Sequence, residues 1–326
     1  MNFWWRSGTV LAVLLAPLAA LYGALAAWQR RRTRPQRLAV PVVVVGNIVV
    51  GGAGKTPTTI ALVRALQAAG WRPAVVSRGY GRRTTDVRAV TADSTAAEVG
   101  DEPLLIHRAT GVPVMVGAQR VAAGRALLAA RPDVNVVVAD DGLQHHALAR
   151  DAQLIVFDAR GVGNGRLLPA GPLREPLPAA LPPRTWVIYN APAPSTPLPG
   201  ACAVRRLAGA VSLADWHRGT AARAEALADM AATSRHAPLW AAAGIAEPER
   251  FFAMLEAAGI AITRLPLPDH APLNQPPWPI GATVLVTEKD AVKLPPSMPG
   301  VWVVPLDFSL PSATVTAVLA ALHHEP

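Results

Sequence analysis

The 326-residue chain has a single cysteine, Cys202. Neither an internal disulfide nor a zinc site built on thiolates is therefore possible. Tracts rich in histidine or cysteine, which would indicate a metal carrier, are missing as well. This composition fits a reducing compartment.

The first 37 positions contain no acidic residue and carry six of the nine net positive charges of the chain. The rest of the chain is therefore only mildly basic. A broad nucleic-acid surface is not indicated, and no recognition-helix, zinc-finger or RNA-binding signature occurs. We therefore expect no nucleic-acid partner. The charges in question are Arg6, Arg30, Arg31, Arg32, Arg34 and Arg37.

Charged residues are also missing from the apolar stretch Thr9–Trp28. About 20 residues at ~1.5 Å each match the thickness of a bilayer core, and Trp4, Trp5 and Trp28 stand at its two ends, as in interfacial aromatic belts. We predict a membrane anchor that keeps the remaining chain on the cytoplasmic side. A signal peptide would carry its basic charge at the other end, and a core helix is rarely apolar on every face. Pro17 leaves open whether the segment spans the bilayer or lies in its interface.

A glycine-rich stretch follows the apolar run Val42–Val45. The pattern predicts a buried strand, a loop and a helix from about Thr56, so that backbone N–H groups and the positive helix end converge on an anion. Lys55 would reach the β- and γ-phosphates, and the Thr56 hydroxyl would hold Mg²⁺. Val49 replaces the usual first glycine, and a simple glycine turn is the disfavoured alternative. We predict a nucleotide-binding loop made of Gly51, Gly52, Ala53, Gly54, Lys55 and Thr56.

A second apolar run, Val134–Ala139, ends in Asp140 and Asp141. P-loop enzymes hold Mg²⁺ through an aspartate delivered by such a strand. We therefore predict that Asp140 and Asp141 join Thr56 as metal partners. A plain Asp-Gly turn is the alternative.

Strand and helix patterns alternate along most of the chain, which predicts an α/β fold. We expect a P-loop nucleoside triphosphate hydrolase-like core with a mostly parallel sheet over residues 38–191, after the anchor and its basic flank at 1–37. Prolines in 192–199 predict a linker to a smaller C-terminal α/β domain, 192–326. Residues 161–183 form a long irregular segment, which is typical of functional or disordered loops. Strands are predicted at 73–77, 112–116, 134–139, 154–158, 186–189, 239–243, 262–265, 284–287 and 301–305.

Seven short motifs occur along the chain in a fixed order. They are Gly46-Asn47 with the glycine loop, Ser77-Arg78-Gly79-Tyr80-Gly81, Gly100-Asp101-Glu102-Pro103, Asp140-Asp141-Gly142-Leu143-Gln144-His145, Leu173-Arg174-Glu175, Pro268-Asp269-His270 and Thr287-Glu288-Lys289-Asp290. In this series the chain resembles the tetraacyldisaccharide 4′-kinase family, the lipid A 4′-kinases of Gram-negative bacteria. It departs from the family at Leu143, where phenylalanine is usual, and at Ala271, where a second histidine is common.

The resemblance implies transfer of the ATP γ-phosphate to the 4′-hydroxyl of a tetraacyldisaccharide 1-phosphate, at the cytoplasmic face of the inner membrane. It also implies that Asp101 is the proton acceptor, aligned by His270, while Lys55 and Mg²⁺ act at the phosphate. No obligate protein partner is implied. Further family positions near the phosphate or substrate are Arg78, Arg120, His145, Arg174 and Glu175.

Two other functions are compatible with a P-loop. A membrane-recruited ATPase switch would carry a second lysine five residues before Lys55, but that position is Val50. A GTPase metallochaperone would carry an [NT]-K-x-D element, but in Thr287–Asp290 the lysine comes one place late. Both remain alternatives to the kinase.

Overall fold

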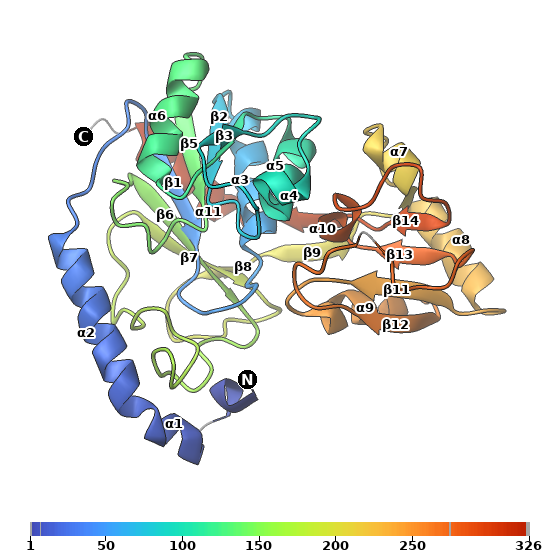
Figure 1. Ribbon diagram of the computed structural model, residues 1–326, viewed down its shortest axis with the longest axis horizontal. Helices are drawn as coiled ribbons and strands as arrows, with labels where there is room; N and C mark the ends of the chain where they lie inside the picture. Colours follow the sequence, from blue (N-terminus) through green and yellow to red (C-terminus); the bar gives the residue numbers. More distant parts are fainter. Residues whose placement is uncertain (1, 7, 274, 324–326) are drawn as a thin grey trace.

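The computed structural model describes residues 2–6, 8–273 and 275–323. In this part of the chain a larger unit is built on an eight-stranded sheet and a smaller one on a five-stranded sheet. Figure 1 shows the two units beside each other. An antiparallel pair of strands, β9 (Val204–Leu207) and β15 (Leu306–Ser309), forms a separate ribbon, and β9 lies between the two units in Figure 1.

The larger sheet has the strand order β3-β4-β2-β5-β1-β6-β7-β8. Its ladders are parallel except for β3 with β4, which confirms the predicted α/β fold with a mostly parallel sheet. The strand predicted at 73–77 is confirmed, whereas the one predicted from Val112 begins two residues later. The strands are β1 (Val42–Gly46), β2 (Pro73–Ser77), β3 (Arg88–Ala89), β4 (Val114–Val116), β5 (Val136–Asp140), β6 (Ala152–Asp158), β7 (Thr185–Asn190) and β8 (Ala201–Cys202).

Strand β1 is buried on both faces, which explains its unbroken run of valines. Because successive side chains of a strand point to opposite faces, Val43 and Val45 pack into one apolar cluster with α3 (Lys55–Ala68), α5 (Asp101–Thr110) and α11 (Ser312–His323). Val42 and Val44 pack into the other, with α6 (Arg120–Ala130). The parallel register pairs Val45 with Asp140. The strand ends that carry the predicted phosphate and metal residues therefore meet at one edge of the sheet.

The smaller sheet has the order β10-β14-β13-β11-β12, with β10 antiparallel to β14 and the other ladders parallel. The strand predicted at 239–243 is confirmed as β11. The strands are β10 (Val211–Ser212), β11 (Leu239–Ala243), β12 (Ile262–Pro266), β13 (Val284–Val286) and β14 (Val301–Val303). The helices in this part of the chain are α7 (Leu213–His217), α8 (Ala224–Ser234), α9 (Pro248–Ala257) and α10 (Glu288–Ala291).

The last helix, α11, returns to the larger unit, where it contacts α3 and β6. The short helix α4 (Ala96–Val99) precedes α5, and α10 of the smaller unit contacts α5 of the larger one. The two units are thus joined by more than the proline-rich segment. The division of the chain after residues 37 and 191 stays a prediction.

The N-terminal apolar stretch is broken rather than continuous. A 3-10 turn, η1 (Asn2–Trp5), is followed by α1 (Val10–Leu14) and α2 (Ala16–Arg32). Pro17 lies in the first turn of α2. Backbone N–H groups in this turn make no hydrogen bond within the helix, so a proline is tolerated there. Within the described residues, no helix has both the length and the apolar character that crossing a bilayer requires. Figure 1 shows α2 running along the outside of the larger unit.

Candidate active site

The glycine loop lies between β1 and α3 and is shaped by a buried asparagine. The Asn47 side-chain amide donates to the carbonyl oxygens of Val49 at 2.6 Å and Gly51 at 3.2 Å. Gly51 and Gly54 have φ of 105° and 93°, a region that favours glycine. The helix begins at Lys55, one residue earlier than predicted, so its free N–H groups point into the loop. This geometry is suited to an anion.

Lys55 lies between the loop and the predicted metal residues. Its Nζ is 3.3 Å from Asn47 Oδ1 and 3.6 Å from Asp141 Oδ1. The Asp141 carboxylate is also paired with the Arg174 guanidinium at 3.3 Å. Burial works to raise the pKa of Asp141, but Lys55, Arg174 and Arg120 outweigh it and lower that pKa. Two cations and a carboxylate therefore meet beside the glycine loop.

Asp140 ends β5 and is buried. One of its oxygens accepts a hydrogen bond from the Thr59 hydroxyl at 2.8 Å, and the other lies 3.4 Å from the Ser77 hydroxyl. Burial, with Glu102 and Asp141 nearby, raises its pKa to about 7. Thr56, the third predicted partner, is also buried. In the part of the chain that the structure describes, no three His, Cys, Asp or Glu side chains are grouped to hold a metal.

Arg174 and Glu175 are joined to the site through Gln144, a residue that the sequence analysis quoted in a motif but gave no role. Gln144 Oε1 accepts from Arg174 at 3.2 Å, while Nε2 donates to Glu175 Oε1 at 2.9 Å and to the Asn47 carbonyl at 3.0 Å. The loop that carries Arg174 also pairs with the glycine loop, because Val49 and Leu173 form a β-bridge. Arg174 is thereby held beside the glycine loop and Asp141.

Arg120 contacts Asp141, and His145 lies close enough to Arg120 to be affected by its charge. Arg120 is buried and donates to the Asp141 carbonyl at 3.2 Å, while its Nε and the Nε2 of His145 are buried with no hydrogen-bond partner among the described residues. Burial, followed by the charge of Arg120, lowers the pKa of His145 to about 4, so its ring is neutral near pH 7. Arg78 is exposed, and its charge acts on both residues. These groups are available to a ligand.

Asp101 and His270 meet across the two units. His270 Nδ1 is 2.9 Å from Asp101 Oδ2 and 3.0 Å from Oδ1. Asp101 is the first residue of α5, with Gly100 as the N-cap, and its Oδ1 also accepts a hydrogen bond from the Glu102 N–H at 2.9 Å. The hydrogen bond to Asp101 raises the pKa of His270. Burial opposes ionisation of Asp101, but His270 and Lys289 prevail and its pKa is lowered.

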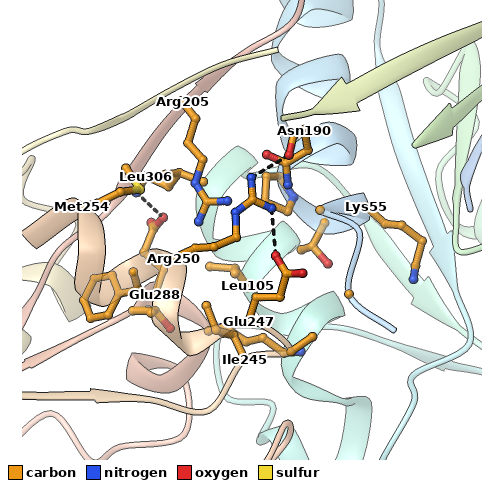
Figure 2. A pocket seen from close by; sticks show the side chains of 18 of the residues that line it. Lys55, Leu105, Asn190, Arg205, Ile245, Glu247, Arg250, Met254, Glu288 and Leu306 are labelled. Atoms are coloured by element: carbon orange, nitrogen blue, oxygen red, sulfur yellow. Dashed lines mark hydrogen bonds and ion pairs between the residues drawn. The ribbon is translucent and has the colours of Figure 1, made fainter. Parts of the chain in front are cut away.

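A cavity of about 170 Å³ opens between the glycine loop and the smaller unit. Figure 2 shows Arg205 and Arg250 pointing into it from the side opposite Lys55. Arg250 donates to the Asn190 carbonyl at 2.6 Å and to Glu247 at 3.1 Å. The Arg205 Nε is buried without a partner among the described residues, and burial lowers the pKa of Arg205 to about 10. The sequence analysis missed this cavity because its walls come from segments far apart in the chain.

The N-terminal elements pack on the loop that precedes Arg174. The Trp4 indole donates to the Pro169 carbonyl at 2.9 Å, and the Tyr22 hydroxyl donates to the Arg174 carbonyl at 2.9 Å. The opposite side of α1 and α2 is exposed and apolar, with side chains 48–75% exposed at Val10, Leu11, Val13, Leu14, Leu18, Leu21, Leu25 and Trp28.

The fold and the site together define a P-loop phosphotransferase: a parallel sheet delivers a glycine loop with its lysine and an aspartate pair to one edge. The family profile described as tetraacyldisaccharide-1-P 4′-kinase matches residues 11–323. The chain belongs to this family.

Curated relatives and a solved structure agree. The chain is 55% identical to the tetraacyldisaccharide 4′-kinase of Leptothrix cholodnii, over 98% of this chain and 94% of that protein. It is 54% identical to the enzyme of Methylibium petroleiphilum, over 98% and 92%. The crystal structure of LpxK from Aquifex aeolicus, described as its "apo" form in complex with ATP, superposes with a TM-score of 0.78. That match covers 96% of this chain and 100% of the other, at 24% identity, and shows the shared fold.

Proposed function

We propose that the protein transfers the γ-phosphate of ATP to the 4′-hydroxyl of a tetraacyldisaccharide 1-phosphate. Membership of the 4′-kinase family supports this activity. The observation that carries it is the meeting of Lys55 and Arg174 on Asp141, at 3.6 and 3.3 Å. Phosphoryl transfer depends on positioning and on neutralising phosphate charge, and these residues supply both at the end of the glycine loop.

The nucleotide would lie across the glycine loop and the neighbouring cavity. Gly51, Gly52, Ala53 and Gly54 would surround the phosphates, with Lys55 at the β- and γ-phosphates. The cavity that opens on Lys55 would receive the nucleoside. Its unpartnered Arg205 N–H is a donor for a base or ribose acceptor.

The oxygen donors of Thr56, Asp140 and Asp141 fit Mg²⁺, which prefers one or two carboxylates and completes its shell with water and phosphate oxygens. The ion would neutralise phosphate charge when bound. Asp140 is buried at the strand end and accepts two hydroxyl contacts, so its orientation is fixed in advance. In the structure, the Asp141 carboxylate pairs with two cations, Lys55 and Arg174. If a metal ion bound this carboxylate, both cations would be free to pair with phosphate oxygens.

The acceptor hydroxyl needs a proton acceptor. In our proposal the Asp101 carboxylate takes that proton, and the Nδ1–H of His270 holds the carboxylate in place at 2.9 Å. Arg120, His145 and Arg78 would contact the phosphate or the sugar, since Arg120 and His145 each have a buried nitrogen without a hydrogen-bond partner among the described residues. Arg174 and Glu175, which are linked by Gln144, would also contact the phosphate or the sugar.

The exposed apolar side of α1 and α2 would lie in the interface of the inner membrane, at its cytoplasmic face. An interfacial helix buries one apolar side and keeps basic residues near the headgroups. The acceptor lipid would be confined to the same surface, and the Tyr22–Arg174 hydrogen bond joins α2 to the loop that we propose contacts this substrate.

The test is to incubate the purified protein with γ-labelled ATP, Mg²⁺ and the disaccharide 1-phosphate in detergent, and to look for labelled lipid. The wild type should label the lipid, whereas Lys55→Ala should reduce labelling by at least about 10²-fold while the protein stays folded. ATP hydrolysis that ignores the lipid would instead favour an ATPase switch. Preference for GTP over ATP in a competition assay would favour the metallochaperone alternative.

A further inference from the structure

The amino group of Lys289 contacts three acceptors that come from both units. Lys289 lies on α10, and its Nζ is 2.9 Å from Asp269 Oδ1, 3.1 Å from Glu102 Oε1 on α5, and 3.4 Å from His270 Nε2. The side chain is only 14% exposed. An ammonium has three donors and no acceptor, so each of its N–H groups has a partner here.

These contacts determine where His270 carries its proton. Because Lys289 can only donate, the ring nitrogen that faces it must accept, and in a neutral ring the hydrogen is then on Nδ1. Nδ1 is the nitrogen that contacts Asp101. The ring therefore donates to the carboxylate, and the carboxylate remains free of a proton.

Asp269 would otherwise draw a second proton onto the ring. Its Oδ2 is 3.7 Å from His270 Nε2, and a ring held between two carboxylates favours the doubly protonated form. Lys289 pairs with this carboxylate and faces the same nitrogen. Tyr80 packs against the ring, with the two ring centroids 5.0 Å apart. The Nζ of Lys293 donates to the carbonyl of the next residue, Ala271, at 3.0 Å.

We propose that Lys289 is a positioning residue that acts through His270: it keeps the ring singly protonated on Nδ1, and it ties that ring to α5 through Glu102. The proton arrangement follows from the contacts alone, while its consequence for turnover rests on the proposed kinase activity. Because Glu102 and Lys289 belong to different units, the arrangement is complete only when the two units are in contact.

The charge of Lys289 also changes the pKa values of His270 and Asp101. Burial works to lower the pKa of Lys289, but Glu102, Asp101 and Asp269 together raise it, so the ammonium stays charged. The hydrogen bond to Asp101 raises the pKa of His270, and the charge of Lys289 works against that rise. Lys289 also helps to lower the pKa of Asp101. Loss of the lysine should raise both pKa values.

The test is nitrogen-15 NMR of the histidine rings in the full-length protein, with the His270 signals assigned by their loss in His270→Gln. At a pH above the raised pKa of His270, the wild-type ring should be neutral with its hydrogen on Nδ1. At the same pH, the ring in Lys289→Met should be doubly protonated or carry its hydrogen on Nε2. Lys289→Arg, which keeps the charge, should retain the wild-type pattern at least in part.

Lys293→Met is the matched control. This lysine is also buried, pairs with Asp290 at 2.9 Å and holds the same loop, but it does not face a ring nitrogen. Its loss should leave the His270 tautomer unchanged. If Lys289→Met does not fold, Lys289→Met/Glu102→Gln removes the ion pair as a unit and should show the same ring change.

Turnover supplies the second measurement. Lys289→Met should lower kcat by up to about 100-fold, as a misplacement of a reacting group by about 1 Å can do, with the KM for ATP changed less than about threefold. A wild-type ring signal in Lys289→Met, or an equal change in Lys293→Met, would overturn the proposal. Absence of lipid phosphorylation by the wild type would overturn the kinase function and leave the ring measurement valid.

Discussion

The Tyr22 hydroxyl donates a 2.9 Å hydrogen bond to the backbone carbonyl of Arg174. On the other side of the same segment, the Arg174 N–H donates to the Ile48 carbonyl at 2.7 Å, and the Val50 N–H donates to the Pro172 carbonyl at 2.8 Å. The loop before Arg174 is thus held between the outer helix α2 and the glycine loop. If α2 moved, for example on binding a membrane, the loop before Arg174 would transmit that movement to the glycine loop.

Tyr22→Phe should weaken use of the lipid more than use of ATP. The change removes one neutral hydrogen bond, worth about 1 kcal/mol, which corresponds to about a fivefold loss in kcat/KM for the acceptor. Steady-state kinetics with each substrate varied in turn would measure it. Tyr189→Phe is the control, because that buried hydroxyl donates to the Leu198 carbonyl, away from the loop. Equal losses for both substrates would contradict a role for Tyr22 in placing the acceptor loop.

Asp140→Asn should raise the Mg²⁺ concentration required for half-maximal activity by about 10- to 100-fold. The wild type should show a pH dependence that this variant lacks. Burial raises the pKa of Asp140 to about 7, so a proton competes with the metal below that pH, and apparent Mg²⁺ affinity should increase between about pH 6 and 8. Titrations of activity against Mg²⁺ at several pH values would measure this. A metal requirement that is the same in Asp140→Asn, Asp141→Asn and the wild type would remove both residues from the metal site.

Asp101→Ala and His270→Ala should each reduce kcat by about 10²- to 10⁴-fold. The double variant should be little worse than either single one, because residues that act as one unit are non-additive. Rapid-quench measurements of the transfer step would separate this effect from product release. Losses that multiply in the double variant would indicate two independent roles and contradict a shared one.

Local pattern was enough to predict the strands and the glycine loop that meet at one edge of the larger sheet. The valine run of β1, the glycines and the two aspartates at the carboxyl end of β5 follow rules of burial and strand-end placement that hold in any parallel sheet. The pairing of Asp101 with His270 has no such local signal, since the two are 169 residues apart. It was expected only because the motif series resembled a known family, and the structure brings the two side chains together.

Long-range packing explains what the sequence did not reveal. The ribbon of Val204–Leu207 with Leu306–Ser309 joins segments about a hundred residues apart, and α11 leaves the smaller unit to cover the larger sheet. Neither arrangement can be predicted from hydrophobic periodicity. Periodicity indicates which side of a helix or strand is buried, but it does not indicate which other element packs on that side. The role of Lys289 was missed for the same reason, although its motif was noticed.

The outer side of α2 provides the last prediction. Removing residues 2–28 would also remove the Trp4 and Tyr22 contacts with the substrate loop, so the sharper change is Leu18→Glu/Leu25→Glu. Both side chains are more than half exposed, at 53% and 56%, and neither change should disturb packing on the body. If this side lies in the membrane interface, each leucine contributes about 1.5–3 kcal/mol of burial, so the double variant should lose at least about 10²-fold in partition to anionic vesicles.

Vesicle sedimentation would measure the partition, and lipid phosphorylation would be compared for acceptor in vesicles and in detergent micelles. Activity should fall in vesicles and stay near the wild-type level in micelles, because tethering only raises the effective concentration of the acceptor. Ile280→Glu is the control, since Ile280 is fully exposed on the smaller unit, far along the chain from the N-terminal helices. If the double variant binds vesicles as tightly as the wild type, another surface carries the attachment, and the interfacial role of α2 is wrong.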